Sequence, residues 1–560
     1  MLVCGAAAYA LCAGAADLWV VGMPEGNRYV HLVILTLLGL AFVTAAEAFL
    51  AFIGAISPAD MFGWPFRAAA IGSLAYSLAW AQPVFVNYWY YDDWGYLRGA
   101  PSAVAYLLAP LNDHFVPLLK IVILGMTRLF GFDYIGAACL QQSAFLIIVL
   151  VLAHLFWPAA RRPWLLILSV GLFAMWPTYG VARTWFAGGF WLTASAGFLA
   201  VYILHGRRVI FGENMHGADV AVSFVLASAT AFISSQTLAP SIYLAAFCLP
   251  PLLLSSGRSM ALKRLAILGA VSLLPTAFAL WGRSVYVISR QLNPSGLWNG
   301  ALFVNLGAFF LNKVLLVRSF RNWRSPVELL VLVLLPMAAA AKRLAALKTI
   351  PPDRRAELAG LIVGGGAMLV LPIAQIGLGR RWSYDAALNA YYVTLPFLGL
   401  WLAWVGSGLA WLRGNDAAPA RFPWSVALVS AILILAAGLS PTLHQGEPSL
   451  NRRIRIVHDE RQFMDSLGAA VCDLARLHRD GPPVRWAPDA DILSCRVCRT
   501  IIGPPQFRRD LGFDSLILIG RRRSCPQASA ILTVPGAPPT DGSESPAAVS
   551  FLRTYFDPPH

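Results

Sequence analysis

The sequence has few charged residues and lacks the motifs of soluble nucleotide-using enzymes. Of its 560 residues only 13% are charged, whereas 58% are hydrophobic. A soluble protein of this length needs more polar surface, so the composition excludes an ordinary globular domain as the main body. We find no phosphate-cradling glycine loop, dinucleotide fingerprint or serine nucleophile elbow in a strand-to-helix setting. We also find no internal repeat, which disfavours a repeat-built transporter.

Acidic residues are scarce relative to basic ones, which gives a formal net charge of +15. The Lys and Arg residues fall mainly in short loops between apolar runs and do not form a basic domain. This distribution disfavours nucleic-acid binding and is typical of loops that orient helices and contact membrane lipids with anionic head groups.

Long apolar runs are abundant instead. About 20 apolar residues cross a bilayer, and thirteen runs approach that length. Two further apolar stretches, 115–130 and 301–317, carry Lys, Arg or Asn and are expected to lie in the membrane interface. The sequence therefore predicts an all-α polytopic membrane protein. The thirteen runs are 2–21, 31–56, 67–86, 135–157, 164–178, 187–205, 218–236, 239–254, 265–281, 327–341, 359–378, 389–412 and 424–440.

Basic loops predict the orientation of these spans. Loops rich in Lys and Arg stay cytoplasmic, and they include Arg161, Arg207 and the segments 258–264 and 342–355. The alternation then places the amino terminus inside. It places outside the loop 87–133, the segments 282–326 and 379–388, and the tail. If 301–317 spanned the membrane, every later element would change sides.

Two domains follow from this alternation. Residues 1–440 form the transmembrane domain, in a plasma (inner) membrane, and residues 441–560 form an extracytoplasmic C-terminal domain. Short β-like runs at 515–519 and 530–534 predict a small α/β fold. The pattern of 464–477 predicts an amphipathic helix, and residues from 535 onward are expected to be poorly ordered.

Four cysteines cluster in this tail. In an extracytoplasmic domain, two structural disulfides are favoured over a zinc or redox site. Spacing alone leaves the pairing open. The cysteines are Cys472, Cys495, Cys498 and Cys525.

The candidate catalytic residues stand in the first large outside loop. Residues 88–98 read YWYYDDWGYLR, and Asp92 and Asp93 are costly to hold near hydrocarbon unless they are solvated, paired or metal-bound. A carboxylate there suits a general base. An aromatic belt with both acids facing water is the structural alternative. Asp113 and His114 extend the same set, or else cap the following helix. These carboxylate oxygens could also bind a divalent metal ion, and the sequence does not decide between the two.

These residues resemble the amino-terminal module of GT-C fold glycosyltransferases, such as protein O-mannosyltransferases and aminoarabinose transferases. The resemblance covers residues 67–160: a span, an acidic pair, a loop helix, and a His-x-x-Pro stretch running into LFG at 129–131. It implies a GT-C-like fold and an inverting transfer from a polyprenyl-phosphate sugar, with Asp92 or Asp93 as base or metal ligand. An Asp-Asp pair replaces the commoner Asp-Glu, and two extra spans precede the module.

A lipid-phosphate donor needs cations on the outer face. Paired guanidiniums at Arg380 and Arg381 are the first candidates, with lipid head-group anchoring as the alternative. The other outside candidates are Arg283, Lys313 and Arg318. Separately, the glycines at 360 and 364–366 predict a stripe for close helix packing without a catalytic role.

The sequence thus predicts a membrane glycosyltransferase that moves a sugar to a hydroxyl of a lipid, glycan or protein acceptor. The alternative is a lipid or glycan transporter or flippase. A transporter carries ionisable residues near the middle of the membrane, whereas most charges here lie at the ends of apolar runs.

Overall fold

The computed structural model describes most of the helical core and parts of the tail. Most described residues are helical. The described residues are 40–62, 103–110, 114–130, 134–160, 186–212, 214–234, 239–254, 258–286, 352–379, 394–406, 448–480, 484–486, 513–525, 531–532 and 545–556, with Leu166, Ser169, Val170, Phe173, Thr237 and Tyr392.

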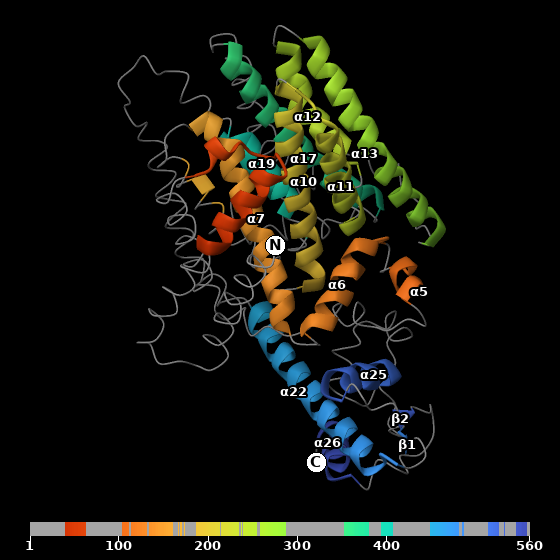
Figure 1. The fold of residues 1–560 in the computed structure, drawn as a ribbon. Coiled ribbons are helices and arrows are strands. Elements are labelled where there is room, and N and C mark those ends of the chain that lie inside the picture. Colours follow the sequence, from red (N-terminus) through yellow and green to blue (C-terminus); the bar gives the residue numbers. More distant parts are fainter. Residues whose placement is uncertain are drawn as a thin grey trace.

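A bundle of long apolar helices forms the larger part of the molecule, and a smaller helical body lies beyond one of its ends (Figure 1). The first bundle helix is Leu40–Phe52. The others are α7 (Tyr134–Ala160), α10 (Trp191–Phe211), α11 (Gly217–Ile233), α12 (Pro240–Leu254), α13 (Arg258–Tyr286), α17 (Pro352–Gly379) and α19 (Thr394–Trp401). Single π-helical turns, Phe186–Phe190 and Leu402–Gly406, precede α10 and follow α19.

Glycines let three bundle helices approach closely, as the stripe in the sequence predicts. An added Cβ at Gly364 of α17 would lie 2.3 Å from the Phe247 ring of α12. A Cβ at Gly365 would lie 2.5 Å from the carbonyl oxygen of Gly399 in α19. Gly366 faces open space. α17 therefore packs between α12 and α19 at distances that a side chain would prevent.

The predicted run 31–56 is helical only to Phe52 within the described residues. Its end is a Schellman motif, in which the Gly54 N–H donates to Ala51 O at 3.0 Å and the Ala55 N–H donates to Leu50 O at 2.8 Å. Gly54 has a φ of 68°, which costs glycine little. The short 3-10 helix Pro58–Asp60 follows.

Two described helices are long and apolar enough to cross a membrane, Ser259–Val285 within α13 and Arg355–Gln375 within α17. Both coincide with predicted spans. Shorter apolar helices occupy parts of the predicted runs 31–56, 135–157, 218–236, 239–254 and 389–412, and α10 occupies much of 187–205. The runs 2–21, 67–86, 327–341 and 424–440, most of 164–178, and the stretch 301–317 lie outside the described residues.

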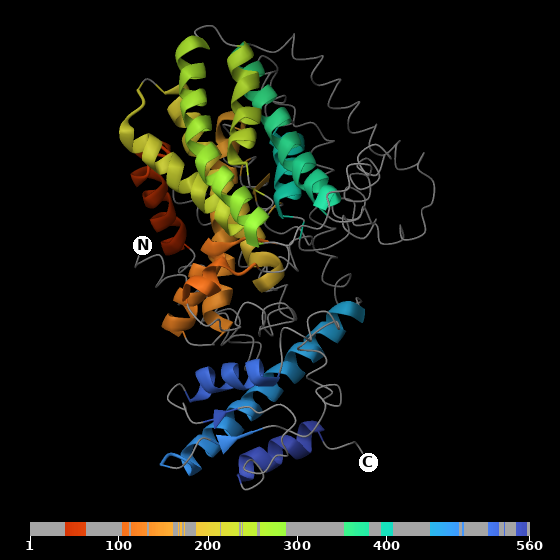
Figure 2. The same cartoon turned by 90° about the vertical axis from the view of Figure 1, so that its right-hand side faces the viewer.

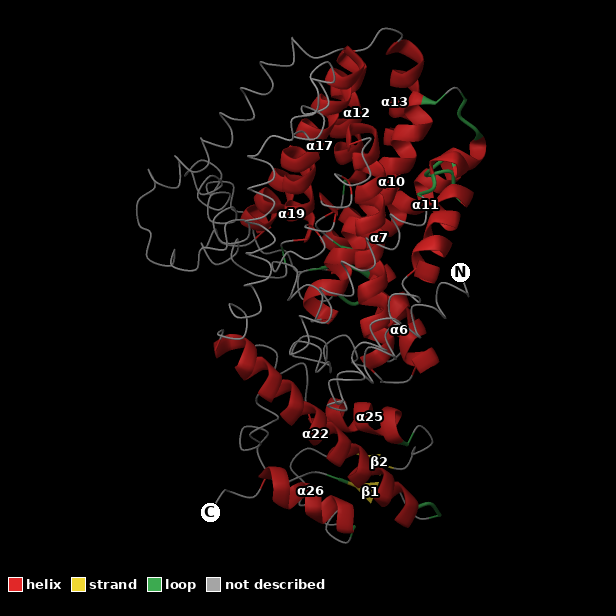
Figure 3. Ribbon diagram, turned by 90° about the vertical axis from the view of Figure 1, so that its left-hand side faces the viewer, coloured by secondary structure: helices red, strands yellow, loops and turns green. Residues whose placement is uncertain are grey.

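Two helices of the predicted outside loop lie against one end of the bundle. They are α5 (Ala103–Leu108) and α6 (Pro117–Phe130). α6 confirms the helix expected over 115–130, and it packs against α11 and α5. Figures 1 to 3 all place α6 between the bundle and the smaller body.

The tail forms that smaller body, in which both helices and strands occur (Figure 3). Helices α25 and α26 both pack on the long helix α22, which contains the amphipathic helix expected over 464–477. Strands β1 and β2 pair in parallel, with Val484 opposite Ile531. The elements are α22 (Pro448–Leu477), β1 (Val484–Arg485), α25 (Phe513–Ser524), β2 (Ile531–Leu532) and α26 (Pro546–Phe556).

Two expectations for the tail are wrong. The run 515–519 is helical and belongs to α25, because Leu516 and Ile519 are buried and Gly520 lies against Leu467 of α22. Tertiary burial here outweighs the β-propensity of the residues. Residues 545–556 are also well formed, since Ser545 caps α26 through Ala548 N at 3.2 Å and Phe551 is buried 5.3 Å from the Phe463 ring.

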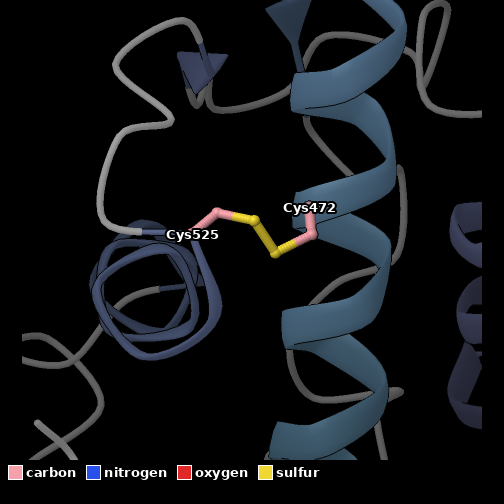
Figure 4. The surroundings of a disulfide bond; sticks show 2 residues. All are labelled: Cys472 and Cys525. Carbon is pink, nitrogen blue, oxygen red and sulfur yellow. A yellow bond between two sulfur atoms is a disulfide. The ribbon is translucent and has the colours of Figure 1, made fainter.

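A disulfide joins Cys472 of α22 to Cys525, directly after α25 (Figure 4). Its Cα atoms are 5.5 Å apart, and the two cysteines are 53 residues apart in sequence. The structure thereby supplies one pairing that spacing left open. Cys495 and Cys498 lie outside the described residues.

Candidate functional site

The candidate site lies where the segment before α6 meets the bundle. His114 and Phe115 lie in the short segment that precedes α6. The His114 ring contacts the Trp191 ring at an interplanar angle of 55°, with centroids 4.7 Å apart. Trp191 is buried and begins α10. The contact brings one predicted site residue onto a helix start far away in the chain.

Phe115 extends this contact to α13. It is buried, and its ring lies directly on the backbone of Gly282, where an added Cβ would be 2.3 Å from Phe115 Cε1. Arg283 follows Gly282 and is half-buried. His114 and Arg283, two predicted site residues from distant parts of the chain, are thus each adjacent in sequence to one packing contact.

Lys120 fixes the loop helices relative to each other. Its side chain is buried, and Nζ donates to Tyr106 O at 2.7 Å and to Ala109 O. Nζ also lies 5.0 Å from the centroid of the Tyr106 ring. A cation is favourable beside the last carbonyls of α5. Lys120 therefore joins α5 to α6 across residues 111–114.

Burial also affects the charge of Lys120. Removal of water from the ammonium lowers the pKa of Lys120 from 10.5 to about 8. The group remains mostly protonated at neutral pH. It therefore contributes a positive charge to this end of the bundle under ordinary conditions.

The remaining predicted site residues lie outside the described part of the chain. Among described residues, no group of three or more His, Cys, Asp or Glu could hold a metal ion, so the divalent metal stays a prediction. The residues outside are Asp92, Asp93, Asp113, Lys313, Arg318, Arg380 and Arg381.

Sequence reasoning missed a buried ionisable pair inside the bundle. Oε1 of Glu47 lies 3.2 Å from Nε2 of His154 in α7, and both side chains are almost fully buried. The Phe62 N–H donates to the same Oε1 at 2.9 Å, and the Phe62 ring stacks on His154 at 4.3 Å. A Glu and a His within predicted spans were the available signal, because ionisable groups in apolar helices require partners.

The two bundle ends carry different polar groups. Near the end of α10, Arg264 of α13 donates to Val209 O and Ile210 O at 3.3 and 3.4 Å. Arg208 donates to Ile56 O at 3.0 Å. These arginines come from segments predicted to be cytoplasmic, whereas His114 and Arg283 come from segments predicted to be outside.

Comparisons with known proteins found no matching family model, no matching curated protein and no matching solved structure.

Proposed function

We propose that this chain is a multi-span membrane protein whose outward-facing end transfers a sugar from a polyprenyl-phosphate donor to an acceptor hydroxyl. The membrane part is supported by the outer surface of α13. Its candidate span of 27 residues is about 40 Å long, enough for a hydrocarbon core of about 30 Å. Large apolar side chains are exposed along it: Met260, Leu262, Ile267, Leu273, Leu274, Phe278, Leu280, Trp281 and Val285.

Such a surface is unfavourable in water and favourable in lipid. Hydroxyl groups of α13 and of its neighbour α11 donate to their own backbone, as Thr276 of α13 does to Ser272 O at 2.9 Å and Thr230 of α11 does to Leu226 O at 2.7 Å. Backbone and hydroxyl groups satisfied within one helix suit a hydrocarbon environment. These features support the lipid-facing assignment.

An extracytoplasmic tail is supported by the Cys472–Cys525 disulfide, since disulfides persist in oxidising compartments. The tail lies at the same end of the molecule as α6 in all three ribbon views. Both parts come from segments predicted to be outside. If the tail covers the site, the tail and the loop 87–133 must lie on the same side of the membrane.

The observation that carries the enzymatic proposal is the contact of the Phe115 ring with Gly282, which brings the chain segment that contains His114 against the segment that contains Arg283. The acidic residues Asp92 and Asp93 belong to the same predicted loop as His114. A carboxylate accepts the proton of the acceptor hydroxyl, and the oxygen of that hydroxyl attacks the anomeric carbon. The bond from that carbon to phosphate oxygen breaks, and Arg283 with Arg380 and Arg381 holds the departing polyprenyl phosphate.

The test is sugar transfer by the purified full chain in lipid discs, with a panel of polyprenyl-phosphate sugars. We expect wild-type transfer to fall at least 100-fold in Asp92→Asn or Asp93→Asn, as for loss of a general base. Arg283→Gln should weaken donor binding more than it changes the rate at saturating donor. Arg128→Gln, a change at an exposed residue of α6, is the matched control for Arg283→Gln. Full transfer by the double Asp variant would contradict the proposal.

One observation favours the alternative of a lipid or glycan transporter. The Glu47–His154 pair places ionisable groups inside apolar helices, which is common in proton-coupled transport. The same discs distinguish the two functions. Movement of an unaltered labelled lipid across the bilayer, reduced by Glu47→Gln and unaffected by both Asp changes, would favour transport.

A further inference from the structure

His205 makes a contact that depends on its number of protons. It lies in the last two turns of α10 and is fully buried. Its Nδ1 is 3.3 Å from Gly54 O, in the turn after the first bundle helix. Its Nε2 is 3.2 Å from Asp219 O, in the first turn of α11. One imidazole thus connects three segments of the bundle.

Both neighbouring atoms are carbonyl oxygens, which only accept hydrogen bonds. A neutral imidazole has one N–H donor and one bare nitrogen, whereas the imidazolium has two donors. In either neutral tautomer one ring nitrogen would present its lone pair to an oxygen lone pair. That arrangement loses one hydrogen bond and leaves a buried carbonyl facing an acceptor. Both contacts are satisfied together only by the cation.

The surroundings contain groups that favour the cation and groups that oppose it. Carbonyls at the end of α10 and beside Gly54 carry partial negative charge. The Asp219 carboxylate, which accepts the His216 N–H at 2.7 Å, adds a full negative charge. The opposing groups are the guanidiniums of Arg208 and Arg264. Their positive charges are partly balanced, because Arg208 donates to Ile56 O and Arg264 donates to the last carbonyls of α10.

The other titratable or charged groups on the elements packed here come from six segments. Tyr202 and Arg207 are on α10, His216 caps α11, and Lys263 is on α13. Described groups on the remaining neighbours are Tyr243 and Cys248 of α12, His154 of α7 and Glu47 of the first helix. Within the described part of the chain, the hydrogen-bond contacts of the His205 ring, at 3.2 and 3.3 Å, are with these two carbonyls.

We propose that His205 is a proton-dependent clamp, which holds the turn at 53–57 against the start of α11 when its imidazole carries two protons and releases it when one proton leaves. Histidine ordinarily changes charge between about pH 5 and 8. The clamp makes this end of the bundle sensitive to pH on its own side of the membrane. The proposal is independent of the proposed sugar transfer.

The first test reads the protonation of His205 directly in the full chain in lipid discs. Nitrogen chemical shifts of labelled histidine distinguish the cation from both neutral tautomers. The chain has nine histidines, and the signal of His205 is the one missing from His205→Gln. We expect the signal of the cation at acidic pH and its conversion to a neutral ring when the pH is raised. A neutral ring at pH 5.5 would overturn the proposal.

The second test follows hydrogen exchange of residues 50–62. At pH 5.5 these amides should exchange about tenfold more slowly in wild type than in His205→Gln, as expected for loss of a charge-assisted hydrogen bond. The ratio should approach one at pH 8.5, and a ratio unchanged by pH would refute the clamp. His478→Gln, in the tail, is the matched control and should give a ratio of one throughout.

An internal reference covers the case in which His205→Gln does not fold. In wild type alone, exchange of residues 50–62 is divided by that of residues 240–254 in α12. The intrinsic effect of pH on amide exchange cancels in this quotient. The quotient should rise as the pH increases from 5.5 to 8.5, and a constant quotient would count against the proposal.

Discussion

The bundle and the tail are held together in different ways. In the bundle, helices without a cross-link among the described residues approach closely at glycines, and large apolar side chains face outward. In the tail, a disulfide joins two helices, and Phe463, Trp486 and Phe551 form an enclosed aromatic core. A disulfide stabilises a small domain whose core is limited, whereas close approach at glycines stabilises contacts between apolar helices.

The largest expected effect is the loss of tail stability when the disulfide is removed. Replacing both Cys472 and Cys525 by Ser should lower the free energy of unfolding of the tail by about 2–4 kcal/mol, because the unfolded chain regains the freedom of a long loop. Hydrogen exchange of peptides from the tail, followed in the full chain as the temperature is raised, measures this loss of stability. A reductant should lower the wild-type value similarly and leave the double variant unchanged.

The corresponding change in the bundle is Gly364→Ala. Its Cβ would overlap the Phe247 ring, and the resulting displacement of α17 from α12 should cost about 1–3 kcal/mol. The matched control is Gly366→Ala, two residues along the same helix, where a Cβ meets nothing within 4 Å. We expect the control to be neutral or slightly stabilising. Equal melting temperatures for the two variants in lipid discs would contradict the packing argument.

Lys120 provides a pH-dependent test at the junction of the two regions. Burial lowers the pKa of Lys120 to about 8, whereas an unfolded lysine keeps its proton to about pH 10.4. The unfolded state therefore binds more protons between these values, and the stability of wild type relative to Lys120→Met should rise as pH increases through this window. Unfolding of α5 and α6, followed by hydrogen exchange at pH 7 and 9.5, measures it. A difference that stays constant would show that the folded lysine is not depleted of protons.

The smallest expected effect is on the surface of the tail. Arg461 and Asp465 form an exposed ion pair at 3.9 Å, one helical turn apart in α22. Solvent screens such pairs, so Arg461→Ala should change stability by no more than about 0.5 kcal/mol. A loss above 1 kcal/mol in thermal unfolding would mean that Arg461 makes a further contact.

Much of the bundle could be predicted because its signals are local. Apolar runs long enough for helices predict α11 and α12 close to their observed bounds, and they predict the central parts of α13 and α17, which begin earlier than the runs do. The strand expected at 515–519 failed because a short β-branched run fits a strand or a buried helix equally well. The packing of α25 on α22 then selects the helix.

For the candidate site, the sequence could nominate residues but could not bring them together. His114 and Arg283 were nominated by residue type and predicted side. The contact of the Phe115 ring with Gly282 joins residues that are far apart in sequence, so no local pattern predicts it. The Glu47–His154 pair is similar, because each residue alone only interrupts an apolar run. Partner choice depends on which helices become neighbours.

The sequence by itself determined the helical class, the apolar surfaces and the glycine stripe, because these depend on the periodicity and composition of single segments. Only the tertiary structure decided the Cys472–Cys525 pairing, the meeting of His114 with α10 and of Phe115 with α13, and the two carbonyls at His205. Each of these is a contact between distant segments, and its energy exists only after the chain has folded around it.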